Sequence, residues 1–355
     1  MKPLLRLSTP FGSALLIALA ISGCGGGSGA SSSVPTPIPT TATFAYLQDT
    51  TTGSYPGVPA YSQASAMRKA STHVAMPRIS ALVNIVAGTQ DAYLVNAATA
   101  SRTKLNSVSG DYRDIDLSLD GTKVVFTAWD SAGYSQIFVA DVSNFNNPSQ
   151  LTSNDTLDHF NARFSLDGAT VLSTIDQNQA LSLSMIPTAG GTETVIRPSG
   201  LLKCWSPSLT LDHTTLVFEG QESSNVNAAI YSINVDGSSL TRLTNPSGSY
   251  WDWRVSLSPD GTKMLFTRYL GSGGANNIYV VGIGGESATV GATQLTTDGY
   301  SWDSIYLAGY VVFVSSKDNQ GLTGNNNIYG MNVDGSNVVR LTNTALEDAF
   351  DLSAI

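Results

Sequence analysis

The chain has 355 residues, of which 42% are hydrophobic and 13% charged, and it contains 33 glycines. This composition predicts a β-rich globular protein with many turns and excludes a chain that is disordered throughout. The formal net charge is -9, and the sequence lacks the basic stripe that binds phosphate groups, so we do not expect a nucleic-acid-binding protein.

The N-terminus is typical of a secretion signal. Lys2 and Arg6 supply its positive charge, and residues 15–21 form an apolar stretch that is too short to span a bilayer as a mature helix. Ser22 and Gly23 come next, and small residues at this point let a signal peptidase approach the backbone. The pattern resembles the signal of bacterial lipoproteins.

Cys24 follows directly and is the expected lipidation site. In bacterial lipoproteins this cysteine is acylated and becomes the new N-terminus once the signal, here residues 1–23, is removed. The residue after the cysteine is Gly25 and not an Asp. In bacterial lipoproteins an Asp at this position prevents sorting to the outer membrane, so Gly25 favours the outer membrane. We therefore expect a lipid-anchored protein of the cell envelope, at the outer membrane and facing the periplasm. An ordinary secretory signal followed by a chance cysteine is the alternative.

Residues 24–42 comprise the acylated cysteine and a linker that is rich first in Gly and Ser, then in Pro and Thr. Such a segment cannot bury a core, and we expect it to act as a tether. The only other cysteine is Cys204, which lies in a strand-like context. We predict that it is a small buried hydrophobic residue, because acylation of Cys24 leaves it no disulfide partner.

Residues 43–355 contain a repeated unit. Its two clearest copies, residues 235–244 and 333–342, read VDGSSLTRLT and VDGSNVVRLT. A unit has a Ser-x-Asp-Gly turn, an aliphatic strand with Phe, a strand such as Ile-Tyr, and a last strand that closes on Leu-Thr. Four such strands predict one antiparallel blade of a β-propeller. The apolar residues that close successive units are Leu105, Leu151, Ile196, Leu243, Leu295 and Leu341.

Six closing residues predict an all-β fold, a six-bladed β-propeller of four-stranded antiparallel blades. The first unit lacks a Ser-x-Asp-Gly strand of its own. Residues 348–353 resemble residues 114–118, the opening strand of the second unit. We therefore expect the C-terminal strand to complete the first blade and to close the ring, which removes open sheet edges.

Residues 43–90 fit the repeat least and form an irregular first blade. Residues 44–47 and 79–83 both look like strands, and we expect one of them to be the second strand of that blade. Residues 55–78 would then be an insertion between them.

The order of motifs in residues 86–355 resembles the TolB-type β-propeller repeat family. Residues 258–263 read Ser-Pro-Asp-Gly-Thr-Lys, and aliphatic-Phe, Ile-Tyr, Asp-Gly-Ser and Arg-Leu-Thr motifs follow in this order along the units. The resemblance implies a six-bladed propeller and a bias towards binding proteins or peptides on one face. In TolB proteins an α/β domain precedes the propeller, and residues 25–90 do not resemble one, so the TolB role is not carried over whole.

The sequence does not predict an enzyme, a metal site or a cofactor. The aspartates of the Ser-x-Asp-Gly turns are expected to cap tight turns in which Gly takes a positive φ. The three histidines are widely separated, which is unfavourable for a metal site. We find no Gly-x-Ser-x-Gly nucleophile elbow. Paired carboxylates at the channel mouth leave a glycosidase or lyase open as an alternative.

Four of the five tryptophans lie where the last strand of one unit leads into the first strand of the next. In a propeller this connection lies on the face where the innermost strand enters the central channel. Aromatic rings and arginines around one mouth suit a protein, peptide or glycan partner, although such rings can instead pack between blades. The candidate partner-binding residues are Trp205, Trp251, Trp253, Arg254, Trp302, Asp303, Arg113 and Phe160.

We therefore expect a monomeric, non-catalytic module that presents its channel mouth to an envelope protein or peptide. Its membrane contact is expected through the lipid anchor only. A carbohydrate-binding or carbohydrate-active envelope propeller is the leading alternative, and a purely structural role in the envelope is the third.

Overall fold

The structure is a computed structural model, and its secondary structure is almost wholly β. Two single 3-10 turns, η1 (Val142–Asn144) and η2 (Lys317–Asn319), are the helical elements of the described chain. None of the helices in this part has the length and apolar character needed to cross a membrane. The described residues are 44–48, 78–86, 89–96, 101–105, 112–118, 120–152, 156–177, 180–224, 226–271, 274–287, 289–307, 310–319, 327–340 and 349–354.

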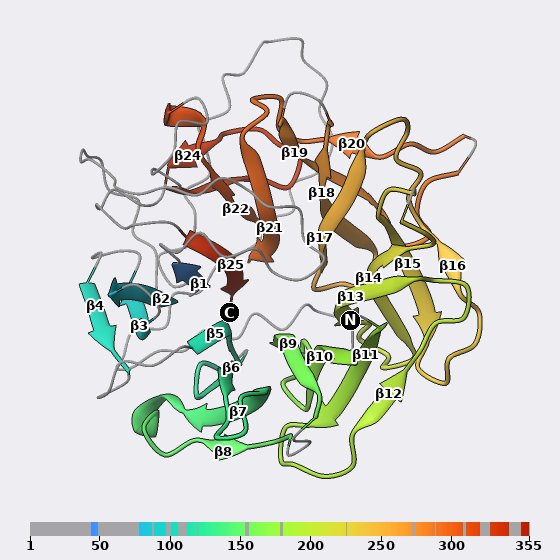
Figure 1. Cartoon of the computed structure of the whole chain (residues 1–355). Coiled ribbons are helices and arrows are strands. Elements are labelled where there is room, and N and C mark those ends of the chain that lie inside the picture. The colour runs from blue at the N-terminus through green and yellow to red at the C-terminus, as the bar shows by residue number, and fades with distance from the viewer. Residues whose placement is uncertain are drawn as a thin grey trace, which may run out of the picture.

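Five sheets are four-stranded antiparallel blades, and each is named here after its first strand. Figure 1 shows them arranged around a common centre, with the first strand of each blade nearest to it. The β5 blade comprises β5 (Tyr112–Leu117), β6 (Lys123–Trp129), β7 (Ser135–Asp141) and β8 (Ser149–Gln150). The β9 blade comprises β9 (Asp158–Phe164), β10 (Thr170–Gln177), β11 (Ala180–Pro187) and β12 (Thr194–Ile196).

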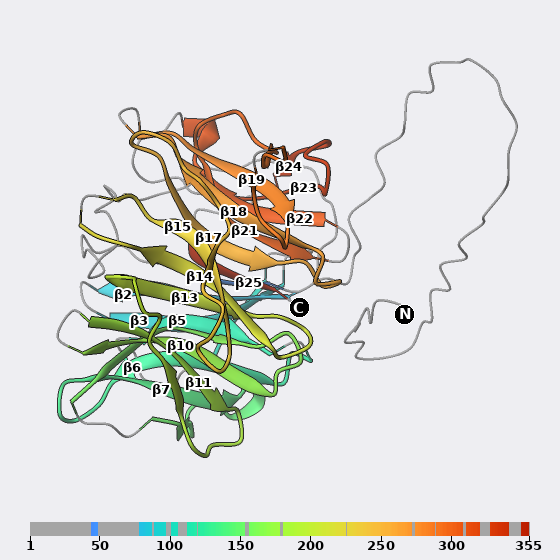
Figure 2. The ribbon, with the colours of Figure 1, turned by 90° about the vertical axis from the view of Figure 1, so that its right-hand side faces the viewer.

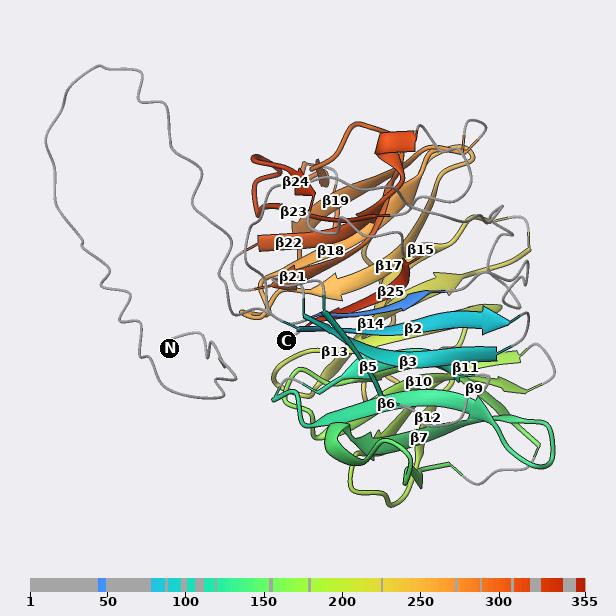
Figure 3. The same ribbon diagram turned by 90° about the vertical axis from the view of Figure 1, so that its left-hand side faces the viewer.

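The β13 blade comprises β13 (Lys203–Leu209), β14 (Thr215–Gln221), β15 (Ala229–Asn234) and β16 (Thr241–Arg242). The β17 blade comprises β17 (Trp251–Leu257), β18 (Lys263–Tyr269), β19 (Asn276–Gly282) and β20 (Thr293–Gln294). The β21 blade comprises β21 (Ser301–Leu307), β22 (Tyr310–Ser315), β23 (Asn327–Asn332) and β24 (Val339–Arg340). The side views show that the strands run through the thickness of the molecule, from one face to the other (Figures 2 and 3).

The remaining sheet contains strands from both ends of the described chain. Its strand order is β25 (Ala349–Ala354), β1 (Phe44–Gln48), β2 (Arg78–Val86), β3 (Thr89–Asn96) and β4 (Ser101–Lys104). β1 runs parallel to β2, whereas the other pairs are antiparallel. The C-terminal strand thus joins the sheet of the first unit, as expected.

The prediction of six four-stranded antiparallel blades is wrong in number, because five sheets have that form. Both strand-like segments of residues 43–90 enter the remaining sheet, where one was expected, and they make it five-stranded with one parallel pair. The predicted signal peptide, Cys24 and the linker lie outside the described residues. The predicted insertion does too, apart from Arg78 at the start of β2.

The core lies between neighbouring blades. One apolar cluster, for example, joins Val217 and Ile230 of the β13 blade to Val255 and Phe266 of the β17 blade. Both faces of the second strands are therefore buried, which explains their continuous apolar runs. A buried phenylalanine recurs in four of these strands and stacks on a ring of the third strand. The pairs are Phe126 with Phe138, Phe218 with Tyr231, Phe266 with Tyr279, and Phe313 with Tyr329.

The Ser-x-Asp-Gly turns join the first and second strands, and their structural role is confirmed. Ser258 Oγ donates a hydrogen bond of 2.6 Å to Asp260, which also accepts the backbone N–H of Thr262 at 3.0 Å. These hydrogen bonds lower the pKa of Asp260 to about 2. Gly261 takes a φ of 69°, and His213 takes a φ of 59° at the equivalent place in the fourth copy. We call the side of the molecule with these turns the turn face.

Cys204 is buried, as predicted. Its side chain is 1% exposed and its Sγ donates to the carbonyl oxygen of Leu181 at 3.3 Å. Burial raises the pKa of the thiol to about 12, so Cys204 is an unreactive packing residue.

Candidate functional site

The innermost strands of the five blades share a bulge at the equivalent place in the repeat. At each bulge the pairing with the second strand shifts register. A residue other than glycine takes a positive φ there, which costs about 1–3 kcal/mol and is typical of positions with a structural or functional constraint. These residues are Asp114, Asn161, Ser206, Arg254 and Asp303, with φ between 47° and 55°.

Hydrogen bonds between blades hold these bulges. In four blades the backbone N–H of the bulge residue donates to a side-chain oxygen of the preceding blade. Two of the acceptors are threonine hydroxyls, and two are carboxylates. The four bonds run from Asn161 to Asp114 (2.8 Å), Ser206 to Thr174 (3.0 Å), Arg254 to Glu219 (2.8 Å) and Asp303 to Thr267 (3.1 Å).

Glu219 departs from the repeat. The equivalent residues of the other second strands are Thr127, Thr174, Thr267 and Val314. Its side chain is 2% exposed, and a carboxylate buried to this degree loses most of its hydration. Burial raises the pKa of Glu219 to about 7, although interactions with Arg254, the Trp205 indole and Arg163 favour its charged form.

Arg254 is a second departure from the repeat, on the strand next to Glu219. It is the arginine among the five bulge residues, and its guanidinium lies over the ring of Trp253 at 5.5 Å from the centroid. Both side chains are half-buried. A cation over an indole ring is attracted by its π electrons. Trp253 and Arg254 therefore form one half-buried unit beside a buried carboxylate, with Arg254 Nη1 and Trp253 Nε1 turned inward.

Trp253 belongs to the side where the innermost strands begin, which we call the mouth face. Three further tryptophans share this face. Trp251 packs edge-on against Tyr269 with the ring centroids 5.6 Å apart, and Trp302 is half-buried. Trp129, at the end of β6, is 43% exposed. Trp129 was not among the residues predicted from the sequence, although it occupies the same repeat position as Tyr269.

The other predicted residues are placed differently. Trp205 is 7% exposed and packs with Phe160 and Leu181 in an apolar cluster between blades, which is the alternative considered from the sequence. Asp303 is 2% exposed. Arg113 lies in β5, and its side chain is outside the described part of the structure. Five members of the predicted set are half-buried: Phe160, Trp251, Trp253, Arg254 and Trp302.

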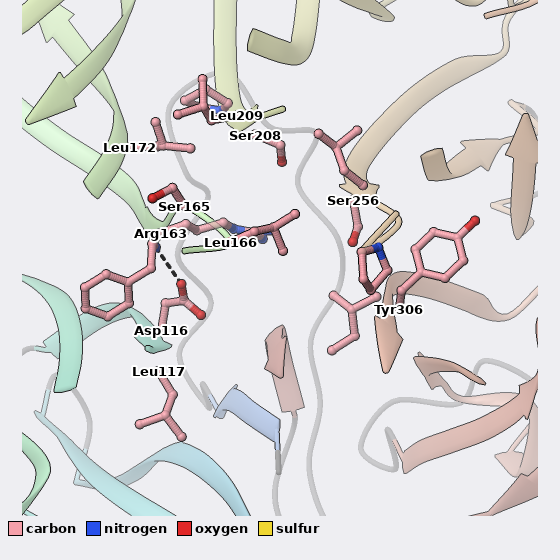
Figure 4. A pocket seen from close by; sticks show the side chains of 15 residues that line it. Asp116, Leu117, Arg163, Ser165, Leu166, Leu172, Ser208, Leu209, Ser256 and Tyr306 are labelled. Atoms are coloured by element: carbon pink, nitrogen blue, oxygen red, sulfur yellow. Dashed lines mark hydrogen bonds between the residues drawn. The ribbon is translucent and has the colours of Figure 1, made fainter. Parts of the chain in front are cut away.

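A pocket of about 120 Å³ lies between the ends of the innermost strands, near the turn face (Figure 4). It is lined by the final residues of the innermost strands, such as Leu117, Leu209 and Leu257, and by the charged Asp116 and Arg163. The backbone N–H of Phe164 donates to Asp116 Oδ2 at 2.7 Å (Figure 4). None of the predicted partner-binding residues is among the described residues that line this pocket.

Ser184, His159 and Glu193 form a polar cluster in the β9 blade. The carboxylate is central: Glu193 Oε1 lies 3.0 Å from His159 Nε2 and also accepts the hydroxyl of Ser184. A nucleophilic serine needs the imidazole as its base. Here Ser184 and His159 both contact Glu193, so the three residues do not form a catalytic triad. Across the described ranges, no group of three or more His, Cys, Asp or Glu side chains is arranged to hold a metal ion.

Comparison with known proteins identifies the fold. No family model matches the sequence, and no curated protein matches it. Among solved structures, TolB from Acinetobacter baumannii aligns with a TM-score of 0.63 and 18% identity, over 78% of this chain and 66% of that one. The putative TolB from Agrobacterium tumefaciens aligns with a TM-score of 0.59 and 19% identity, over 75% and 98%. This chain has a TolB-like propeller fold.

The TolB-like fold is shared with proteins of other functions. An oligogalacturonate lyase in complex with manganese aligns with a TM-score of 0.52 and 16% identity, over 72% of this chain and 71% of that one. At such identities the likeness concerns the fold, and function has to be argued from the residues of the TolB-like propeller itself.

Proposed function

We propose that this TolB-like propeller is a non-catalytic module of the cell envelope that binds a protein or peptide at its mouth face. The observation that carries the proposal is that one face bears the exposed Trp129 and the half-buried Trp251, Trp253 and Trp302, with Arg254 lying over Trp253. Tryptophan, tyrosine and arginine are the residues enriched where partners bind most strongly.

The proposal includes a closed ring in which the five-stranded sheet serves as a sixth blade. β25 contacts β21 on one side and β5 on the other, which are the innermost strands of the last and first regular blades. A closed ring would hold the mouth face rigid and would leave few open sheet edges.

The proposal also includes attachment to the membrane. The residues before Cys24 support acylation there, and the Gly/Ser and Pro/Thr composition of residues 25–42 supports a tether that holds the propeller away from the lipid surface. Gly25 supports sorting to the outer membrane, and the proposal places the propeller on the periplasmic side.

The alternative partner is a carbohydrate. Exposed tryptophans also stack on sugar rings, and an oligogalacturonate lyase has a similar fold. The described histidines do not gather with acids into a metal site, and the pocket holds one carboxylate, Asp116. We favour the protein partner because tryptophan and arginine together are the residues enriched where protein partners bind most strongly.

The test is capture of partners from solubilised envelope by the full chain in detergent, followed by direct binding measurements on the captured protein. The double variant Trp253→Ala/Trp302→Ala should lose at least tenfold in affinity. Leu211→Ala, which removes a 47% exposed side chain from the turn face, is the control and should bind normally. Equal loss in both variants, or binding of glycans in place of any protein, would contradict the proposal.

A further inference from the structure

Two departures from the repeat meet at one junction between blades. Glu219 replaces the threonine or valine of the other second strands, and Arg254 is the arginine of the bulge set. The two are joined by the hydrogen bond from the Arg254 backbone N–H to Glu219 Oε1 at 2.8 Å. A threonine hydroxyl makes the same bond elsewhere in the ring, so the bulge itself does not require a carboxylate.

The charged pair is a costly way to hold this bulge. Burying a carboxylate costs more hydration energy than burying a threonine hydroxyl. Replacing a buried ion pair by uncharged residues often leaves stability unchanged or raises it. Arg254 also adopts a φ of 55°, a region that suits Asn or Asp better than Arg. A role other than stability accounts for both residues more simply.

We propose that Arg254 is the anchor of the mouth face and binds a carboxylate side chain from an acidic segment of the partner, which displaces Glu219 as its counter-charge. This inference rests on the function proposed above and names the chemistry of the partner. Arg254 is half-buried on the indole of Trp253, so its guanidinium is held in place, and guanidinium groups bind carboxylates through paired hydrogen bonds.

Binding of the ligand carboxylate to Arg254 is coupled to the uptake of a proton by Glu219. Glu219 is faced by Arg254 from β17, by Arg163 from β9 and by the Trp205 indole from β13, and its partner across β15 is Ile230. When the ligand takes over Arg254, the buried carboxylate loses part of its stabilisation and binds a proton from solvent. Its pKa of about 7 in the free protein places this uptake near neutrality.

The test uses three probes against the full chain in detergent: an acetylated and amidated tetraglutamate peptide, its tetraglutamine counterpart, and tetragalacturonate. Tetraglutamate should bind about tenfold more weakly at pH 8 than at pH 6, because its own carboxylates stay ionised and one protein site must gain a proton. Tetraglutamine should bind at least tenfold more weakly than tetraglutamate at pH 6.

Four variants distinguish binding at Arg254 from a general effect of the protein's charge. Arg254→Gln should lose tetraglutamate binding at least tenfold. Arg242→Gln, which removes an arginine 31% exposed on the outer strand β16, should change it less than twofold. Arg254→Asn is a second variant that suits the positive φ, and thermal melting verifies that each variant folds. Glu219→Gln should bind with the same affinity at pH 6 and pH 8.

Three results would overturn the inference: tetraglutamate binding that survives Arg254→Gln, a pH dependence that survives Glu219→Gln, or Arg254-dependent binding of tetragalacturonate alone, which would make this an acidic-glycan site. The proposed function fails separately. If a captured partner is lost by Trp253→Ala/Trp302→Ala but retained by Arg254→Gln, the binding module stands and the arginine anchor is wrong.

Discussion

Asp252 and Arg268 form a two-pronged ion pair in the interior of the β17 blade. Arg268 Nε lies 2.6 Å from Asp252 Oδ1, and Nη2 lies 2.8 Å from Oδ2. The Asp252 side chain has no exposed surface, and the Arg268 side chain is 12% exposed. Arg268 also contacts Glu286 at 3.1 Å and lies over the rings of Phe266 and Tyr279. One guanidinium thus serves two carboxylates and two aromatic rings.

Loss of one partner of this pair should be strongly destabilising. Asp252→Asn should lower the free energy of unfolding by about 3–5 kcal/mol, because it leaves Arg268 buried without half of its counter-charge. Asp141→Asn breaks the exposed pair with Lys123, whose acid is 58% exposed, and should cost less than about 1 kcal/mol. Urea unfolding of the two variants measures both values, and similar costs would contradict this reading.

Gly285 allows a turn of the β17 blade to lie against Leu243, the residue that follows the last strand of the β13 blade. Its φ is 77°, and a Cβ there would clash with the carbonyl oxygen of Leu243 and lie 2.7 Å from its Cα. Gly285→Ala should therefore cost at least about 2 kcal/mol. Gly284→Ala places a methyl group in open space at the adjacent residue and should be nearly neutral. The difference in melting temperature between the two variants is the measurement.

Glu219 should make the stability of the protein fall as the pH rises. Its pKa is raised by burial from an ordinary 4.5 to about 7 in the folded state, so the folded state binds more protons than the unfolded state between these values. Stability is then lost from pH 4.5 upwards and levels off above pH 7, by about 3 kcal/mol in total.

Glu219→Thr, the residue of other blades, should remove this loss. The free energy of unfolding of the variant, relative to the parent, should rise by about 3 kcal/mol between pH 4 and pH 8. Thr267→Val removes the equivalent acceptor of the β17 blade without changing a charge and should have the same effect at each pH. A pH-independent difference for Glu219→Thr would show that the buried carboxylate does not titrate in this range.

Glu193 should make the stability of the protein fall as the pH is lowered, the opposite of the effect of Glu219. Burial raises the pKa of its carboxyl, but hydrogen bonds from His159 and Ser184 outweigh burial and hold the pKa below the ordinary 4.5. Its contribution to stability is therefore present above pH 4.5 and is lost as the pH falls through the lower, folded-state pKa. Glu193→Gln should cost about 1 kcal/mol at pH 6 and less at pH 3, as measured by denaturant unfolding. An equal cost at both pH values would argue against the linkage.

The regular blades could be predicted from the sequence because their signals are local. In the turn at Ser258, Asp260 and Thr262, every hydrogen bond forms within five residues. The first sheet could not be predicted in this way. Its parallel pairing of β1 with β2 and its pairing of β1 with β25 join distant segments, and alternating apolar residues do not specify which strand lies beside which.

The burial of the candidate residues could be predicted only in part, for a similar reason. Trp205 and Trp253 occupy the same place in the repeat, yet Trp205 is buried by Phe160 and Leu181 whereas Trp253 remains half-buried under Arg254. Whether the ring is buried depends on the side chains that the neighbouring blade supplies, which a local repeat pattern does not specify. Glu219 was overlooked within an apolar strand, although alignment of the second strands shows a carboxylate where the other blades have Thr127, Thr174 and Thr267.

The pairing of Phe44 with Ala354 in the five-stranded sheet has a consequence for the order of folding. Each regular blade is built from adjacent stretches of chain and can form as soon as its four strands are available. The sheet with β1 and β25 must wait until the last strand has been synthesised, and the long loop it closes makes it a late, slow step. Until then β1 presents an unpaired edge, so a chain stalled before residue 349 would be the form most exposed to aggregation.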